Sequence, residues 1–225
     1  MTTLSLTIEQ KNASAPQSLN VTVSSVVIAG FAGRDRAATE HHIAELEAVG
    51  VPRPAQIPTY YRSSTSRLNG DGAIEVLGGD SSGEVEPVVV AWEGKLYVTV
   101  GSDHTDRKLE TVGIDLSKQI CDKPVASVAW PMDEVADHWD SLVLRSYATI
   151  DGARVLYQDG GTVALLPPSE IIKGYGNGSL PDGVVMFGGT IGAIGGIRPA
   201  TRFEGELHDP VLGRTISFGY DVKVI

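Results

Sequence analysis

Cysteine is almost absent from this chain of 225 residues, which contains only Cys121. A single cysteine excludes an intrachain disulfide, and we interpret it as a small buried apolar residue rather than a nucleophile. The N-terminal segment has no basic start followed by an apolar core, so it does not resemble a signal peptide. No apolar run is long enough to span a bilayer. Together these absences predict a cytoplasmic protein that does not insert into a membrane.

Basic residues are also in short supply, since 18 Lys and Arg stand against 28 Asp and Glu. The formal net charge of −10 argues against binding to nucleic acid and against docking on anionic membranes. Aromatic residues make up only 6% of the chain, whereas glycine occurs 26 times. This composition favours strands and turns over a helical bundle. The chain also lacks a repeat of fixed period and a low-complexity linker, so we predict one β-rich domain over residues 1–225 with a few short helices.

The chain does contain two valine-rich runs, EVEPVVVAW and KLYVTVG, which are joined at Glu93-Gly94. Two such runs around a glycine-containing pair predict a β-hairpin. A two-residue turn at this pair would place Glu84 directly opposite Asp103, with Glu86 on the same face as Glu84. A slip of one residue would move Asp103 to the other face, so this prediction depends on the turn.

Three carboxylates at the open end of one hairpin need an explanation, because like charges that face each other on a sheet repel. A bound divalent cation would supply one, while a raised pKa and a splayed, solvated strand end are alternatives. Oxygen ligands in this arrangement suit magnesium, manganese or calcium better than zinc. On the residues alone, an ordinary strand with a solvated face also stays open.

The rest of the chain predicts short strands, three short helices and a glycine-rich loop. Strands are expected over 4–8, 19–29, 74–77, 141–150, 153–157, 184–187, 202–207 and 213–224, and helices over 35–49, 133–139 and 168–173. The glycine-rich run 188–196 lacks the Gly-Lys-Ser/Thr of a nucleotide-binding loop. Its backbone N–H groups either receive an anion such as a carboxylate or form a tight turn between strands.

Five segments in order resemble the fumarylacetoacetate hydrolase superfamily, and in particular a branch described only as a domain of unknown function. The segments are VIAGFAGRDR at 27–36, GEVEPVVV at 83–90, SDHTDR at 102–107, SKQIC at 117–121, and 180–206, which includes GGTIGAIGGIRPATRFEGE. The resemblance runs from about Ser25 to the C-terminus, which leaves residues 1–24 as an N-terminal strand extension. It implies a β-rich α+β fold, a mixed β-roll with short peripheral helices, that is usually a homodimer.

The resemblance also implies a metal site and several substrate contacts. The family binds Mg²⁺ or Mn²⁺ through a Glu-x-Glu pair and a later Asp, which match Glu84, Glu86 and Asp103. The family lysine matches Lys118, which would hold the keto or enolate oxygen of the substrate. Thr190, which follows Gly189 in the glycine-rich loop, would hold the substrate carboxylate. Gln158 resembles a family glutamine that lies near the substrate.

The chain departs from the family at the histidine that activates water for hydrolysis. Asp35 or Arg36 stands in its place. On the predicted helix over 35–49, His41 and Glu45 are near enough in sequence to substitute, and we take them as candidate catalytic residues. We expect this helix, with Tyr60 and Tyr61, to close over the site. Tyr61 and Arg62, which lie in the irregular segment 51–67, are predicted substrate contacts.

These features predict a metal-dependent enzyme that acts on a small 2-oxo or enolisable carboxylate through a metal-stabilised enolate. Hydrolysis of a C–C bond is the first choice; decarboxylation, dehydration and tautomerisation follow, because all of them share the enolate. The alternatives are a metal-independent binding or structural protein that kept the fold without the chemistry, and a calcium-stabilised β domain.

Overall fold

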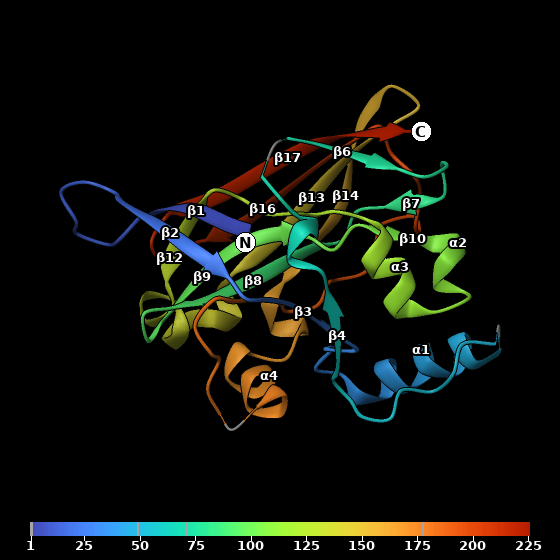
Figure 1. Cartoon of the computed structure of the whole chain (residues 1–225), viewed down its shortest axis with the longest axis horizontal. Helices are drawn as coiled ribbons and strands as arrows, with labels where there is room; N and C mark the ends of the chain where they lie inside the picture. The colour runs from blue at the N-terminus through green and yellow to red at the C-terminus, as the bar shows by residue number, and fades with distance from the viewer. Residues whose placement is uncertain (1, 49, 71, 177) are drawn as a thin grey trace.

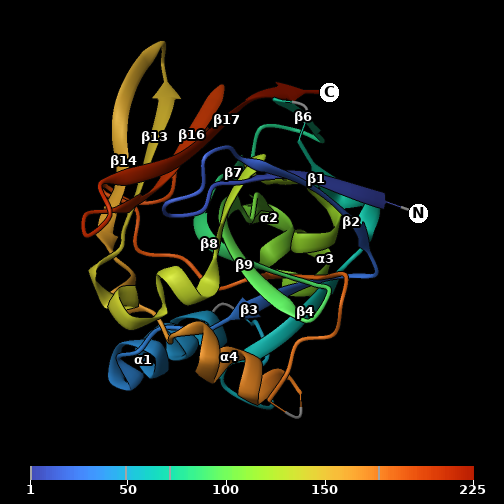
Figure 2. The same cartoon turned by 90° about the vertical axis from the view of Figure 1, so that its left-hand side faces the viewer.

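Two mixed sheets carry most of the structure, a computed structural model that describes residues 2–48, 50–70, 72–176 and 178–225 (Figure 1). The larger sheet has the strand order β2-β1-β12-β9-β8-β15-β3-β4, and the smaller has the order β14-β13-β16-β17-β6. Parallel pairs occur in both, between β1 and β12, β3 and β15, and β6 and β17. Figure 2 shows the larger sheet curled into an open roll, with the smaller sheet standing beside it. The predicted β-rich α+β class is confirmed.

The strands of the larger sheet are β1 (Thr2–Ile8), β2 (Gln17–Val23), β3 (Ser25–Gly30), β4 (Thr59–Ser63), β8 (Val85–Trp92), β9 (Lys95–Ser102), β12 (Val128–Pro131) and β15 (Val184–Phe187). Those of the smaller sheet are β6 (Ala73–Val76), β13 (Val143–Ile150), β14 (Ala153–Gly161), β16 (Arg202–Asp209) and β17 (Arg214–Val224). Two-residue strands pair β5 (Leu68–Asn69) with β11 (Lys123–Pro124) and β7 (Ser81–Ser82) with β10 (Thr105–Asp106).

The helices are short and peripheral. They are α1 (Arg36–Ala48), α2 (Arg107–Glu110), α3 (Ile114–Ile120) and α4 (Pro168–Tyr175), with 3-10 turns η1 (Thr65–Arg67), η2 (Met132–Glu134), η3 (Ala136–Ser141) and η4 (Thr162–Ala164). None of the helices in the described part of the chain is both long and apolar enough to cross a membrane.

Strand β8 lies at the centre of the packing, because it contributes to three hydrophobic clusters. Val85 belongs to the cluster between the two sheets, Val88 and Val90 to the cluster inside the roll, and Val89 and Ala91 to the cluster that α4 covers. A strand that is covered on both faces needs a continuous apolar run rather than an alternating one. This explains the uninterrupted valines of the sequence and makes β8 a rigid support for the residues at its start.

The β8–β9 hairpin has the predicted register. Glu93 and Gly94 form the turn with φ values of 51° and 69°, and the pairing runs back to Val85 opposite Ser102. One step beyond the strands, the Asp103 backbone N–H donates to the Glu84 carbonyl at 3.0 Å. The turn dipeptide therefore fixes which side chains meet at the far end of the hairpin.

Helix α1 follows the prediction at its start. The Asp35 carboxylate caps the helix and accepts from the N–H groups of Ala37 at 2.9 Å and Ala38 at 3.1 Å. The predicted end at Val49 lies outside the described residues.

Two other predicted elements differ from the structure, and two helices have no counterpart in the prediction. The expected strand over 19–29 is divided into β2 and β3, because the Ser24 N–H leaves the β1–β2 pair and donates to the Gly183 carbonyl at 2.9 Å. Residues 133–139 form 3-10 turns instead of one helix, with non-helical dihedral angles at His138. Helices α2 and α3 were not predicted, since 109–118 has only weak periodicity and each helix is under three turns long.

Gly101 tests how tightly the hairpin packs. A Cβ atom there would lie 2.7 Å from the Pro124 carbonyl oxygen and 3.0 Å from the Phe187 ring. We expect Gly101→Ala to lower the free energy of unfolding by about 1–3 kcal/mol, the usual effect of overpacking. The control is Gly79→Ala, where the new Cβ meets no atom within 4 Å. Chemical denaturation that gave equal values for the two variants would contradict this packing.

Candidate metal and substrate site

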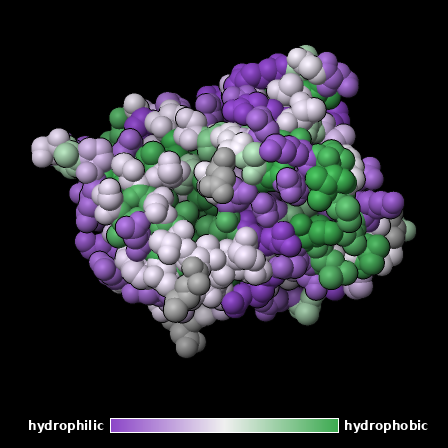
Figure 3. All heavy atoms as spheres, turned by 45° about the horizontal axis from the view of Figure 1, so that its top comes forward, coloured by the Kyte–Doolittle hydropathy of each residue, from purple (hydrophilic) through white to green (hydrophobic). Residues whose placement is uncertain are grey.

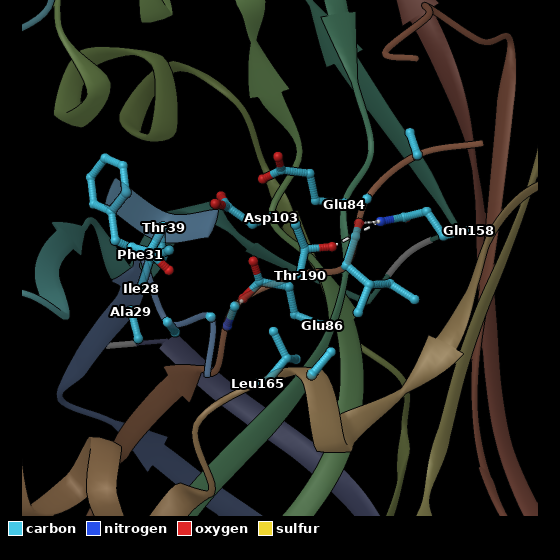
Figure 4. Close-up of a pocket in the computed structure, with 18 of the residues that line it drawn as sticks. Ile28, Ala29, Phe31, Thr39, Glu84, Glu86, Asp103, Gln158, Leu165 and Thr190 are labelled. Carbon is cyan, nitrogen blue, oxygen red and sulfur yellow. Dashed lines mark hydrogen bonds between the residues drawn. The ribbon is translucent and has the colours of Figure 1, made fainter. Parts of the chain in front are cut away.

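A pocket of about 610 Å³ opens at the free end of the β8–β9 hairpin. Its wall combines the end of β3 and the start of α1, the α2–α3 region, and the glycine-rich loop after β15. Figure 4 shows Glu84, Glu86 and Asp103 facing one another in this pocket, with Phe31 and Ile28 to one side and Gln158 to the other. Segments far apart in the sequence therefore meet around three carboxylates.

The three carboxylates lie close enough to share one ion, since each offers an oxygen and these atoms lie within 4.8 Å of one another. Glu86 and Asp103 are buried, with 2% and 0% of their surface exposed, and Glu84 is partly buried. The hairpin register alone produces this arrangement, because Glu84 and Glu86 are two residues apart on one strand and Asp103 lies across from Glu84.

Three cationic side chains balance these carboxylates. The Lys118 Nζ lies 2.6 Å from Asp103 Oδ2 and 3.1 Å from Glu84 Oε2, and it also donates to Thr105 Oγ1 at 2.9 Å. The Arg107 guanidinium lies 2.9 Å from Glu84 Oε1 and 3.0 Å from Glu110 Oε2. The third cation, on the other side of Asp103, is a fully buried lysine.

That lysine, Lys123, places its Nζ 3.2 Å from Asp103 Oδ1 and donates to the carbonyl oxygens of His104 and Cys121. Sequence reasoning missed Lys123 and Arg107. Arg107 stands within the matched segment 102–107, so that segment was a usable signal for it. Lys123 had none, because pairings between distant segments place it under the site: β11 pairs with β5, and the following residues Val125 and Ala126 pair with β9.

The cations divide the carboxylates electrostatically. Burial would raise the pKa of Glu84, but Arg107 and Lys118 outweigh it and hold this pKa at about 2. Burial, and then the negative charges of Asp103 and Glu84, raise the pKa of Glu86 well above its usual range. Burial would lower the pKa of Lys118, yet Asp103 and Glu84 raise it, so Lys118 is an ammonium ion. Glu86 is thus the carboxyl group that lacks a cation of its own.

The residues fit a divalent cation. Both oxygens of Asp103 are buried, and among the described residues their polar contacts are the ammonium groups of Lys118 and Lys123. Glu86 Oε2 accepts a hydrogen bond from the Gly189 N–H at 2.9 Å. Three carboxylates whose oxygens converge within 4.8 Å, one of them with a raised pKa, are the surroundings that a hard cation satisfies.

The glycine-rich loop is held against the hairpin. Gly189 has φ of 90°, and a Cβ atom there would lie 2.9 Å from the Ala32 Cβ, so only glycine fits. The Thr190 hydroxyl donates to the Val85 carbonyl at 2.8 Å. With its proton already used, this hydroxyl cannot also donate to a substrate carboxylate, so the predicted contact would have to come from the Thr190 backbone N–H.

Gln158 links the hairpin to the same loop. Its Oε1 accepts from the Val85 N–H at 3.0 Å, while its Nε2 donates to Thr190 Oγ1 at 2.9 Å and to the Ile191 carbonyl at 2.6 Å. Gln158 lines the pocket as predicted, but both ends of its amide are already used. Its contacts favour a role in positioning the loop.

Two predicted substrate contacts lie next to each other on β4, and only one reaches the pocket. Tyr61 lines it, whereas Arg62 is exposed and its Nη1 lies 3.4 Å from the Tyr175 hydroxyl. Successive residues of a strand point to opposite faces, so the two side chains cannot both face the site. The structure therefore corrects the expectation for Arg62.

The predicted catalytic pair His41 and Glu45 is not part of the described pocket lining. The two side chains are 78% and 61% exposed on α1, and the His41 Nε2 lies 3.4 Å from Glu45 Oε1. The first turn of α1 lines the pocket instead, through Ala38 and Thr39. A catalytic role for the pair would require α1 to move.

Solved structures with this fold cover nearly the whole chain. A fumarylpyruvate hydrolase candidate from Burkholderia cenocepacia has 18% sequence identity and a TM-score of 0.66, over 98% of this chain and 91% of that one. 2-Keto-3-deoxy-D-arabinonate dehydratase complexed with magnesium and 2,5-dioxopentanoate has 19% identity and a TM-score of 0.65, over 95% and 78%. A fumarylacetoacetate isomerase/hydrolase candidate from Oleispira antarctica has 16% identity and a TM-score of 0.64, over 98% and 99%.

These similarities confirm the fumarylacetoacetate hydrolase fold that the sequence predicted. At this level of identity they show the fold alone. No curated protein sequence matches the chain significantly. One family model does match, over residues 29–220, and it is described as a protein of unknown function, DUF2848. The chain belongs to this DUF2848 family, on a fumarylacetoacetate hydrolase fold.

Proposed function

We propose that this protein is a divalent-metal-dependent enzyme that acts on a small 2-oxo or enolisable carboxylate, with hydrolysis of a C–C bond as the first choice. The observation that carries the proposal is the cluster of Glu84, Glu86 and Asp103 beside the buried ammonium group of Lys118 in the pocket. The magnesium complex of the structurally similar dehydratase supports Mg²⁺ or Mn²⁺ as the metal. Decarboxylation, dehydration and tautomerisation remain the alternative reactions.

In this proposal the three carboxylates hold the cation, which would polarise the oxo group of the substrate as a Lewis acid. Asp103, Glu84 and Thr105 hold the Lys118 ammonium in place, so it can donate to the oxygen on which enolate charge develops. Because this donor is fixed before the reaction, little reorganisation is needed when the charge forms. The N–H groups of the glycine-rich loop would receive the substrate carboxylate.

A metal titration combined with a turnover screen tests the proposal. Saturating Mg²⁺ or Mn²⁺ should raise the free energy of unfolding, by about 2.7 kcal/mol at a concentration 100 times the Kd, because the ion binds the native state only. Acylpyruvates and other 2-oxo acids should then show metal-dependent turnover. An unchanged melting curve at saturating metal would contradict the metal site, and a Ca²⁺ response alone would favour the calcium-stabilised alternative.

A non-catalytic binding protein is the second candidate. The exposed position of His41 and Glu45 favours it, because the described pocket lining contains no histidine. Such a protein would turn over none of the oxo acids, and its melting curve would not depend on Mg²⁺.

We expect α1 and the segment around Tyr61 to close over a bound ligand. The start of α1 already lines the pocket, and closure would bring His41 and Glu45 nearer. Oxalate with Mg²⁺ should slow amide hydrogen exchange in 36–48 relative to Mg²⁺ alone, whereas α4, which lies outside the pocket lining, should not change. Equal exchange in 36–48 at confirmed saturation would argue against a lid.

Other predictions from the sequence join the proposal. A single domain and a cytoplasmic location stay predictions, and so does a homodimer. Exposed apolar side chains support the dimer: Figure 3 shows them gathered on the side where α2 and α3 lie in Figure 1, and Val112 and Leu116 are 70% and 51% exposed there. Light scattering in solution would measure the oligomeric state.

A further inference from the structure

We propose that the substrate of this site is a 2-oxo acid whose tail is uncharged and apolar, and not a dicarboxylate. This inference rests on the proposed function and adds the chemical class of the part of the substrate that lies away from the metal. It follows from how charge is distributed over the wall of the pocket.

Charged side chains are concentrated around the predicted metal site. They are Glu84, Glu86, Asp103, Arg107, Glu110 and Lys118, while Asp35 is a further charged residue of the lining. The remaining described lining is mainly apolar and includes Ile28, Phe31, Ala38, Leu165, Ile191 and Ile197. Figure 4 shows Ile28, Phe31 and Leu165 bordering the space next to the carboxylates. A substrate with its oxo-carboxylate head at the metal would therefore place its tail against hydrocarbon.

A second carboxylate on the tail would find no cation to pair with. Arg107 and Lys118 are the cationic side chains of the described lining, and both already contact carboxylates of the chain. A charge that is buried without a partner costs several kcal/mol, so an uncharged tail is strongly preferred.

The mouth of the pocket also disfavours a second negative charge. Asp35 lines the pocket and keeps its own carboxylate at the N-terminus of α1, where it accepts from the N–H groups of Ala37 and Ala38. The positive end of this helix is thereby neutralised, and the Asp35 charge would repel an incoming anionic tail.

The arginines in neighbouring segments do not line the pocket. Arg36 at the start of α1 and Arg62 on β4 are exposed, while Arg34 and Arg198 have partners within the chain. The Arg34 guanidinium pairs with Asp140 at 2.7 Å, and its Nε donates to the Leu165 carbonyl at 3.1 Å. The Arg198 Nη2 donates to the Ile194 carbonyl at 2.9 Å, and its guanidinium carbon lies 5.8 Å from the centre of the Tyr157 ring. Of the two, Arg198 is the one that a movement of the glycine-rich loop could carry toward the pocket.

The pocket has room for such a tail. Its volume of about 610 Å³ is much larger than a metal ion and a three-carbon oxo acid require. Phe31 stands at its edge with φ of 56°, a left-handed conformation that is uncommon for an aromatic residue. Strained backbone of this kind persists where the surrounding structure holds it, often at binding sites.

Two acids of nearly equal shape test the inference. 5-Methyl-2-oxohexanoate carries an isopropyl group where 2-oxoglutarate carries its second carboxylate. Calorimetry with saturating Mg²⁺ should show the apolar acid binding at least tenfold more tightly, since each buried carbon is worth about fourfold in affinity. Oxalate, which has no tail, is measured first as the control for the head group.

A reciprocal test introduces a cation into the apolar part of the pocket and asks whether a dicarboxylate then binds more tightly. Ile197 lines the pocket and is 56% exposed, so Ile197→Arg can be accommodated. It should strengthen 2-oxoglutarate binding by about tenfold through a charge-assisted hydrogen bond, with oxalate binding unchanged. Ile197→Gln, which has a polar but uncharged side chain, should not produce this gain.

The outcomes separate this inference from the function on which it rests. If oxalate does not bind with Mg²⁺, the proposed function fails and the inference falls with it. If oxalate binds but 2-oxoglutarate equals or exceeds the apolar acid, the proposed function stands and the inference is overturned. If Arg198→Ala then bound 2-oxoglutarate more weakly than the apolar acid, Arg198 would be the cation that pairs with the second carboxylate.

Discussion

Replacement of Lys118 by Met should lower kcat on a true substrate by about 10²-fold or more, the scale of losing one oxyanion donor. The side chain keeps most of its length and loses only the ammonium group that would face the developing enolate. An interaction that is stronger in the transition state than in the ground state affects turnover more than binding. Oxalate, which resembles the enolate, should therefore bind the variant more weakly.

Lys118→Met should weaken oxalate binding but strengthen the binding of Mg²⁺. Lys118 is 6% exposed and lies beside two of the predicted ligands, Asp103 and Glu84. Loss of its charge leaves buried carboxylates incompletely paired, which should lower the free energy of unfolding of the metal-free protein by roughly 3–5 kcal/mol. It also removes a positive charge that repels the cation, so the stabilisation by Mg²⁺ should be larger than in the parent.

The matched control is Lys108→Met, because Lys108 is exposed on α2. This variant should keep the stability, metal response and turnover of the parent. If calorimetry with Mg²⁺ showed equal oxalate affinity for Lys118→Met and the parent, Lys118 would not be part of the site.

Glu86→Gln should abolish the stabilisation by Mg²⁺ or Mn²⁺ and, with it, metal-dependent turnover. An amide is a weak ligand for a hard cation, so the loss in metal affinity should exceed the 10–100-fold that outer contacts contribute. The metal-free variant should nevertheless be at least as stable as the parent, because burial and the charges of Asp103 and Glu84 oppose ionisation of Glu86. Glu75→Gln, at an exposed position on β6, is the control.

The pH dependence of stability provides a second measurement on the same variant. Below the usual carboxyl pKa of 4.5, Glu86 carries a proton in both the folded and the unfolded chain. As the pH rises, the unfolded chain ionises first because the folded pKa is raised, so this residue makes the metal-free parent lose stability. Glu86→Gln should lack that part of the decline. Denaturation curves that fall in parallel for both proteins would contradict the raised pKa.

The cluster of three carboxylates was predictable because it depends on local geometry. A turn at Glu93-Gly94 fixes the register of the hairpin, and the register places Glu84 opposite Asp103. No other part of the chain is needed for this inference. Lys123 reaches Asp103 through the pairing of its segment with β5 and β9, and no sequence pattern encodes such contacts between distant segments.

The error at Arg62 has a similar cause. Its place next to Tyr61 was visible in the sequence, but the face of β4 that turns toward the pocket depends on how β3 and β4 pair at the edge of the sheet. The division of the predicted strand 19–29 at Ser24 likewise depends on Gly183, about 160 residues later in the chain. Where the structure depends on distant partners, local patterns cannot predict it.

The ion pairs around Asp103 and Glu84 bear on whether the chain folds before or after it binds the metal. In small zinc domains the ligands repel one another until the ion arrives, so folding and metal uptake are a single step. Here Lys118, Lys123 and Arg107 already neutralise most of the charge. The chain can therefore complete its fold before it meets an ion, and a chelator should remove the metal without unfolding it. The ion would then bind to and dissociate from the folded protein, and the fraction of active molecules would depend on the concentration of free metal.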